Sequence, residues 1–121
     1  MKAELQRFDG QEGLQRLAPV ASIEVSDQTS FRAHVIGAGL SPTVYVDDIS
    51  MSPLLGLRLL GTPRLPRFVF LLMLVAGRAR VIGPDRTIDV RPGDAVVVDT
   101  STPVRFESAE PVRLLRLVTS L

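Results

Sequence analysis

Residues 68–99, FVFLLMLVAGRARVIGPDRTIDVRPGDAVVVD, decide the fold of this chain. The stretch alternates apolar, β-branched runs with short turns, and such a composition favours β-strands. The turn Arg91-Pro92-Gly93-Asp94 has proline at its second position and glycine where a type II turn needs a positive φ. Strands separated by such short turns are typical of an antiparallel meander or a small barrel. We expect four of them, over residues 68–76, 78–82, 87–90 and 95–99, with a second turn at residues 83–86.

The flanking residues predict one short helix and more strands. Residues 1–7 are expected to be a loose arm. Asp9 and Glu12 have the spacing of a capping box, which predicts a helix from Gly10 to Leu17 that docks on the barrel through Leu14 and Leu17. Gly37-Ala38-Gly39 is expected to end a strand. Further strands are expected over residues 23–25 (at an edge), 31–36, 43–50, 54–60 (with a bulge at Gly56), 104–107 and 112–118, and residues 63–67 read as a stiff basic connector.

These elements fit a single domain of 121 residues. We divide it into an arm and helix over residues 1–30 and a β-barrel over residues 31–121. Within residues 31–36 the apolar Phe31, Ala33 and Val35 share one face, and Arg32, His34 and Ile36 share the other. Residues 68–75 are apolar on both faces. One face should fill the barrel, and the other should be covered by the N-terminal helix or by a partner chain.

Composition and charge exclude several classes of protein. The chain has no cysteine, so it has no disulfide and no thiolate nucleophile. Its formal net charge of +1 is too low for the strongly positive surface that is typical of nucleic-acid-binding domains. The first thirty residues lack the apolar run of a signal peptide. Residues 68–76 are far shorter than the roughly 20 residues of a membrane-spanning helix. We therefore expect a soluble, cytoplasmic protein with no membrane contact.

Catalytic groups are sparse. His34 is the single histidine, so two histidines and a carboxylate cannot be combined into a metal site. Asp47 and Asp48 are adjacent on a strand and face opposite sides, which prevents them from acting as an acid–base pair. Ser52 and Ser101 have no evident His–Asp relay. We expect no catalytic residue, no metal and no cofactor, and we assign Asp94 and Asp99 to bonds with backbone N–H groups inside their turns.

Four short motifs together suggest a family. They are Phe31-Arg32-Ala33, Gly77-Arg78, Pro92-Gly93-Asp94 and Asp99-Thr100-Ser101-Thr102-Pro103. In this combination the chain resembles the N-terminal sensor domain of AraC-type transcriptional regulators, over residues 8–121 and most strongly over residues 71–106. The resemblance implies a mainly β protein, a cupin-like antiparallel β-barrel or jelly roll of about eight or nine strands with a short N-terminal helix. Pro92, Gly93, Asp94, Asp99 and Pro103 would be its structural turn residues.

The resemblance also implies a function. Such a domain senses a small-molecule effector and mediates dimerisation without catalysis, and DNA is bound by a C-terminal helix-turn-helix domain that lies outside these 121 residues. Two alternatives stay open: a stand-alone cupin-type enzyme or small-molecule-binding protein, and a protein-interaction module without a ligand. The mouth of a small barrel is the expected ligand site. Our candidate ligand-binding residues there are Arg32, His34, Tyr45, Arg67 and Met73.

Overall fold

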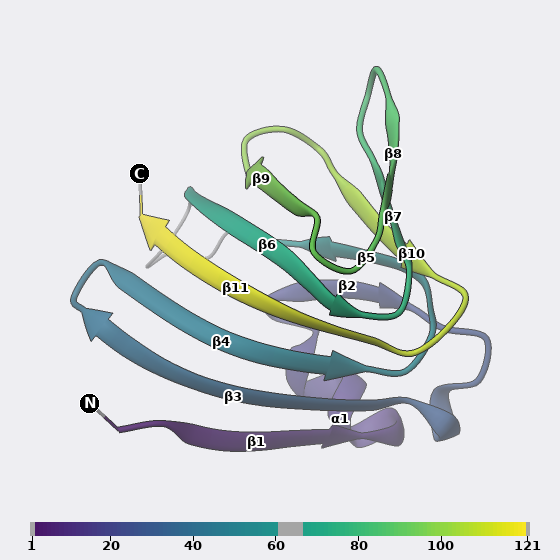
Figure 1. Cartoon of the computed structure of the whole chain (residues 1–121). Helices are drawn as coiled ribbons and strands as arrows, with labels where there is room; N and C mark the ends of the chain where they lie inside the picture. Colours follow the sequence, from purple (N-terminus) through teal and green to yellow (C-terminus); the bar gives the residue numbers. More distant parts are fainter. Residues whose placement is uncertain (1, 61–66, 121) are drawn as a thin grey trace.

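Two antiparallel sheets face each other in the computed structural model, which describes residues 2–60 and 67–120 (Figure 1). The six-stranded sheet has the order β1 (Glu4–Asp9), β3 (Arg32–Ser41), β4 (Val44–Met51), β11 (Val112–Ser120), β6 (Phe68–Ala76), β9 (Ala95–Asp99). The five-stranded sheet has the order β2 (Ala21–Glu24), β5 (Leu54–Leu59), β10 (Arg105–Ser108), β7 (Ala79–Ile82), β8 (Thr87–Val90). The helix α1 (Gly10–Leu17) and the 3-10 turn η1 (Gln28–Ser30) complete the described elements.

The strands expected in the central stretch are confirmed, but their pairing is not that of a meander. β6 pairs with β11 and β9, whereas β7 pairs with β8 and β10 in the other sheet. The chain changes sheets at Gly77 and again at the Arg91–Asp94 turn, where both glycines have a positive φ. The result is a mainly β, jelly-roll-like sandwich, as the resemblance implied. The two sheets stay separate and do not close into a continuous barrel.

The N-terminal residues differ from the expected loose arm. Residues from Glu4 onward form β1, which pairs with β3 along its whole length and raises the number of described strands to eleven. The helix has the predicted bounds, and Leu14 and Leu17 pack on the core cluster that contains Phe8 and Phe31. The predicted capping box is not formed. The Asp9 side chain makes no cap hydrogen bond and instead approaches the Arg32 guanidinium at 3.7 Å.

The second difference lies in β3. This strand runs through Gly37, Ala38 and Gly39, where we expected it to end. Strand pairing with β4 supplies the backbone partners, and Gly37 leaves room for the Tyr45 side chain of the neighbouring strand. The bulge expected near Gly56 is present, because three steps along β5 match two steps along β10. Of the expected basic connector, residues 63–66 lie outside the described residues.

The core fills the space between the two sheets. Its buried side chains form three clusters, and Phe31 and Phe70 are the most deeply buried large residues. Phe106 of the five-stranded sheet contacts all three clusters and therefore ties the layers together. No helix in the described part of the chain is long and apolar enough to cross a membrane.

Candidate functional site

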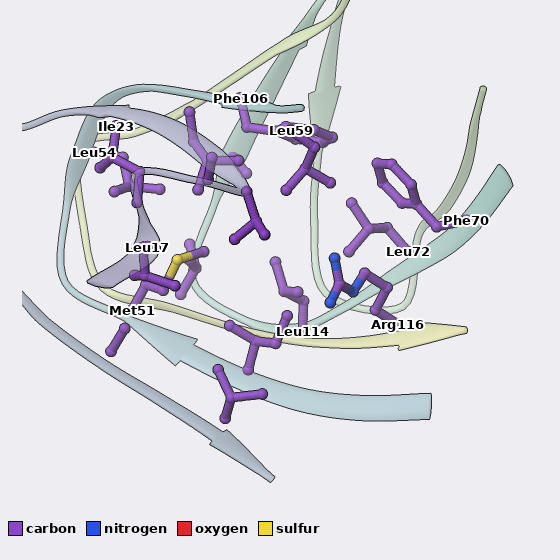
Figure 2. Close-up of a pocket in the computed structure, with 18 of the residues that line it drawn as sticks. Leu17, Ile23, Met51, Leu54, Leu59, Phe70, Leu72, Phe106, Leu114 and Arg116 are labelled. Carbon is purple, nitrogen blue, oxygen red and sulfur yellow. The ribbon is translucent and has the colours of Figure 1, made fainter. Parts of the chain in front are cut away.

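A cavity of about 370 Å³ lies between the two sheets. Its wall includes residues of both sheets and Leu17 of α1, as Figure 2 shows. The lining is almost entirely aliphatic and aromatic, because alternate positions of each strand point into the sandwich. The largest of these side chains include Leu17, Met51, Leu59, Phe70, Leu72, Phe106 and Leu114. Its size and character are those of a small-molecule site.

One end of this cavity carries a buried ion pair. Arg116 of β11 and Asp47 of β4 are direct cross-strand partners, and both side chains point inward. The guanidinium donates two parallel hydrogen bonds to the carboxylate, Nε to Oδ1 at 3.0 Å and Nη2 to Oδ2 at 2.6 Å. The Asp47 side chain is fully buried and that of Arg116 is 19% exposed. In Figure 2 the guanidinium extends into the cavity beside Leu72, at the end of the cavity that is remote from Leu17 and Leu54.

Tyr45 lies beside this ion pair. Its phenol extends diagonally across β3, and a Cβ at Gly37 would overlap its hydroxyl. Burial and then the negative charge of Asp47 raise the pKa of Tyr45, and the positive charge of Arg116 opposes them. The phenol is therefore a neutral hydrogen-bonding group at physiological pH. We call Tyr45, Asp47 and Arg116 the polar corner of the cavity.

Ser108 is a second polar group in the wall. It is buried, and its Oγ has no hydrogen-bond partner among the described residues. Ser108 lies opposite Leu54 in the β10–β5 register, which puts it toward the end of the cavity that is remote from the polar corner. Buried hydroxyls are nearly always paired, so this one is available to a water or a ligand.

Of the five candidate ligand-binding residues, Tyr45 alone lines the cavity. Arg32, His34 and Met73 occupy positions on the opposite face of the six-stranded sheet, because their neighbours along β3 and β6 are the buried ones. Arg67 is exposed and its Nη2 lies 3.4 Å from the Asp99 carboxylate. The structure does not bring these five residues together.

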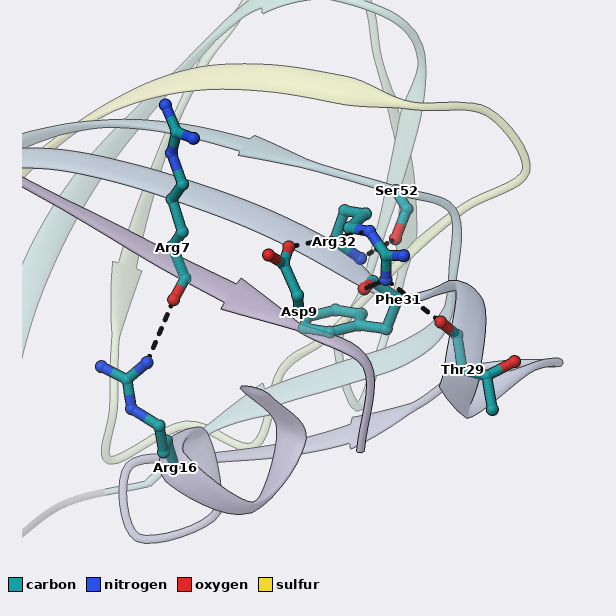
Figure 3. A network of polar contacts seen from close by, with 7 residues as sticks. All are labelled: Arg7, Asp9, Arg16, Thr29, Phe31, Arg32 and Ser52. Carbon is teal, nitrogen blue, oxygen red and sulfur yellow. Dashed lines mark hydrogen bonds and ion pairs between the residues drawn. The ribbon is translucent and has the colours of Figure 1, made fainter. Parts of the chain in front are cut away.

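Arg32 instead joins the N-terminal elements. Figure 3 shows its guanidinium donating to the carbonyl oxygens of Thr29 and Phe31, at 3.1 and 2.6 Å, and facing Asp9. Its backbone N–H donates to Ser52 Oγ at 3.0 Å. Close by, Arg16 of α1 donates to the Arg7 carbonyl at 3.1 Å. These contacts hold α1 and η1 against the six-stranded sheet.

The two turn aspartates bond within their own turns. Asp94 accepts the N–H of Arg91 at 2.9 Å, inside the turn that contains Pro92 and Gly93. Asp99 accepts the N–H of Ser101 at 2.8 Å, and this bond lowers its pKa more than the nearby Arg67 does. Pro103 follows in the same connection to β10. These side chains are therefore engaged in backbone support, outside the cavity.

No group of three or more His, Cys, Asp or Glu side chains that could hold a metal ion occurs in residues 2–60 and 67–120.

The two ion pairs between β4 and β11 lie on opposite faces of the sheet. Asp48 bonds Arg113 on the outer face, while Asp47 bonds Arg116 inside, as the alternation of neighbouring residues requires.

Arg116 was not among the residues expected at the ligand site. Its signal was present, since Leu114 and Val118 are its inward-facing neighbours and a charged residue interrupts an apolar face there. An arginine at such a position requires a buried partner. Which carboxylate supplies that partner is decided by strand pairing.

The sequence model of the AraC-binding-like domain family matches residues 15–118. This chain belongs to that family. The AraC-binding-like domain is also similar in structure to the AraC-like transcriptional activator CuxR, at 15% identity and a TM-score of 0.73, with 98% of this chain and 47% of that chain covered. No curated protein sequence gives a significant match.

Two further solved structures share the cupin-like fold. Ectoine synthase from P. lautus matches at 11% identity and a TM-score of 0.59, covering 73% of this chain and 64% of that chain. An RmlC-like cupin protein from Desulfovibrio desulfuricans matches at 14% identity and a TM-score of 0.55, covering 74% and 81%. The AraC-binding-like domain thus spans less than two thirds of the activator and of the synthase.

Proposed function

We propose that this AraC-binding-like domain is the non-catalytic, effector-sensing part of an AraC-type transcriptional regulator in the cytoplasm. The observation that carries the proposal is the cavity of about 370 Å³ between the sheets, with an apolar wall and one polar corner. A well-formed apolar pocket with a few converging polar groups is the usual form of a small-molecule site. The effector is proposed to bind there.

DNA binding is assigned to another domain. The net charge of +1 gives this chain no basic footprint, and the match to the activator CuxR leaves about half of that protein uncovered. A helix-turn-helix domain elsewhere in the regulator would make the DNA contacts. The effector would then act by favouring one arrangement of the sensing domain over another.

Dimerisation is the second part of the proposal. The outer face of β11, β6 and β9 exposes six large apolar side chains, Leu71, Met73, Val75, Val97, Leu115 and Leu117. α1 contacts β1, β2, β3 and η1, so it leaves this outer face open. Contiguous exposed apolar surface commonly marks an association site. A second copy of this chain is proposed to cover it.

A thermal-shift screen against a metabolite library tests the sensing role. A cavity ligand at about 100 times its dissociation constant adds about 2.7 kcal/mol of apparent stability. A library that never stabilises the chain would count against sensing.

Sedimentation tests the dimer, since the unaltered chain should self-associate at micromolar concentration and Leu117→Glu should shift it to monomer. A monomer at every concentration would refute this role for the outer face.

A stand-alone cupin-type enzyme is the competing function, because ectoine synthase is among the similar structures. Metal analysis and turnover assays separate the two functions. The sensing domain should contain less than stoichiometric transition metal and show no turnover of the ligands found in the screen. Stoichiometric metal together with turnover would favour the enzyme.

A further inference from the structure

We propose that the cavity binds an uncharged, largely apolar small molecule whose single hydrogen-bond acceptor is bound by the guanidinium of Arg116. The inference rests on the proposed sensing function and names the class of ligand for the same cavity. Three properties of the wall lead to it: its apolar character, the donors of Arg116 and the local balance of charge.

The wall requires an apolar body. Among the described lining residues only Tyr45, Glu107, Ser108 and Arg116 have polar side-chain atoms, and Arg80 already bonds Glu107 at 3.1 Å. A ligand with many hydroxyls, such as a sugar, would leave most of them without partners in this cavity. Each unpaired buried hydroxyl costs on the order of 1–3 kcal/mol. The wall therefore selects hydrocarbon or aromatic surface.

Arg116 provides the donors for one acceptor. A guanidinium has five N–H groups in a rigid plane. Asp47 accepts two of them through Nε and Nη2, and no other described residue accepts a hydrogen bond from Arg116. Asp47 also fixes the plane of the guanidinium, so it acts as a positioning residue. The remaining N–H groups can bond a carbonyl or ether oxygen of a ligand without any change in the ion pair.

The charge of the polar corner disfavours an anionic ligand. The buried Asp47 carboxylate already neutralises Arg116, so the net charge of the two side chains is zero. A carboxylate ligand would put a second, unbalanced negative charge into the same low-dielectric space. An uncharged acceptor gains the charge-assisted hydrogen bond without that penalty.

Three probes of matched shape test the class: acetophenone has a neutral acceptor, ethylbenzene has none, and benzoate is an anion. Their dissociation constants for the purified chain are measured by calorimetry or by NMR titration. Acetophenone should bind at least about tenfold more tightly than ethylbenzene, the effect of one hydrogen bond to a charged donor. Benzoate should bind no more tightly than ethylbenzene.

The variant pair Asp47→Leu and Arg116→Met, made together, tests the assignment to the polar corner. Replacing both partners of a buried ion pair with apolar side chains is often neutral or stabilising, so the double variant should fold. In it the preference for acetophenone over ethylbenzene should fall to within about twofold to threefold. The matched control is Asp48→Asn with Arg113→Gln, which removes the outer ion pair of the same two strands and should keep the full preference.

Several results would overturn the inference. They are equal binding of acetophenone and ethylbenzene to the unaltered chain, tightest binding of benzoate, no binding of any probe, or a preference that survives in the double variant. The probe series on the unaltered chain decides the matter if the double variant does not fold. A polar library metabolite that stabilises the chain while all three probes fail would overturn the ligand class alone. Failure of the library and of the probes together would overturn the sensing function as well.

Discussion

Gly77 and Gly93 carry the chain between the two sheets with φ values of +88° and +93°. Most residues reach this region only with strain, which costs roughly 1–2 kcal/mol for a residue with a Cβ. The two sites differ in their surroundings. A Cβ at Gly77 would collide with the Pro111 carbonyl oxygen, whereas a Cβ at Gly93 has no atom within 4 Å.

Alanine substitutions at these two glycines should separate strain from collision. Gly93→Ala should lower the free energy of unfolding by about 1–2 kcal/mol through backbone strain alone. Gly77→Ala should lower it further, because the clash with backbone cannot be relieved by a side-chain rotation. Urea unfolding of both variants measures the difference. Equal losses would mean that the backbone near Pro111 moves aside freely.

Replacement of Ser108 should stabilise the chain, whereas the two glycine substitutions should destabilise it. Its buried hydroxyl has no partner among the described residues, and leaving such a group unpaired costs on the order of 1–3 kcal/mol. Ser108→Ala should therefore raise the free energy of unfolding of the ligand-free chain by about 1 kcal/mol. Ser50→Ala, on the outer face of β4, is the control and should change it little. A clear loss of stability in Ser108→Ala would indicate that a bound water already pairs the hydroxyl.

At the scale of elements, Arg32 joins β3 to η1 and β1 and has no part in the cavity. The Arg32→Ala substitution removes the guanidinium and with it the two hydrogen bonds to the Thr29 and Phe31 carbonyl oxygens. Since the site is exposed, the expected loss of stability is about 0.5–1 kcal/mol. Probe binding in the cavity should not change.

The control for Arg32 lies on the same face of the same strand. His34→Ala removes an exposed side chain two residues away and should leave the stability within about 0.5 kcal/mol. Thermal or urea unfolding together with acetophenone titration measures both variants. A weakened affinity in Arg32→Ala would show that the N-terminal contacts shape the cavity from outside.

For the whole molecule, acid should reduce stability through carboxylates on three separate surface sites. The pKa values of Asp27, Asp48 and Asp99 are all held below the ordinary 3.8, by hydrogen bonds from Ser30, from Arg113 and from the Ser101 backbone respectively. A lowered pKa in the folded state means that the unfolded state binds more protons. The stabilisation is therefore fully present above pH 3.8 and is lost as the pH falls through the folded pKa values.

Urea unfolding at pH 7 and pH 3 measures this effect. The unaltered chain should lose stability between the two pH values, and Asp48→Asn should lose less, because the amide that replaces the carboxylate has no proton to gain. Asp85→Asn, in the exposed turn between β7 and β8, serves as the control and should retain the full dependence on pH. If Asp48→Asn and Asp85→Asn behave alike, the bond from Arg113 contributes nothing to acid stability.

The positions of the central strands and turns followed from the sequence because their causes are local. Proline and glycine fix the Arg91–Asp94 turn, and β-branched runs fix the strands on either side. The alternation within residues 31–36 also separated the two faces of this strand, but it did not say which face is inside: Arg32 and His34 were expected at the cavity, and the structure puts Ala33 and Val35 there instead. These properties depend on residues within a few positions of one another.

Only the tertiary structure decided the pairing of strands and the location of the cavity. Residues 68–75 are apolar on both faces, so their sequence could not say that Leu72 faces the cavity and Met73 faces outward. Likewise, Arg116 finds Asp47 across 69 residues of sequence because β11 lies beside β4. Local preferences fix where each strand runs, but the burial of apolar surface between two whole sheets fixes which strands meet and which side chains share the interior.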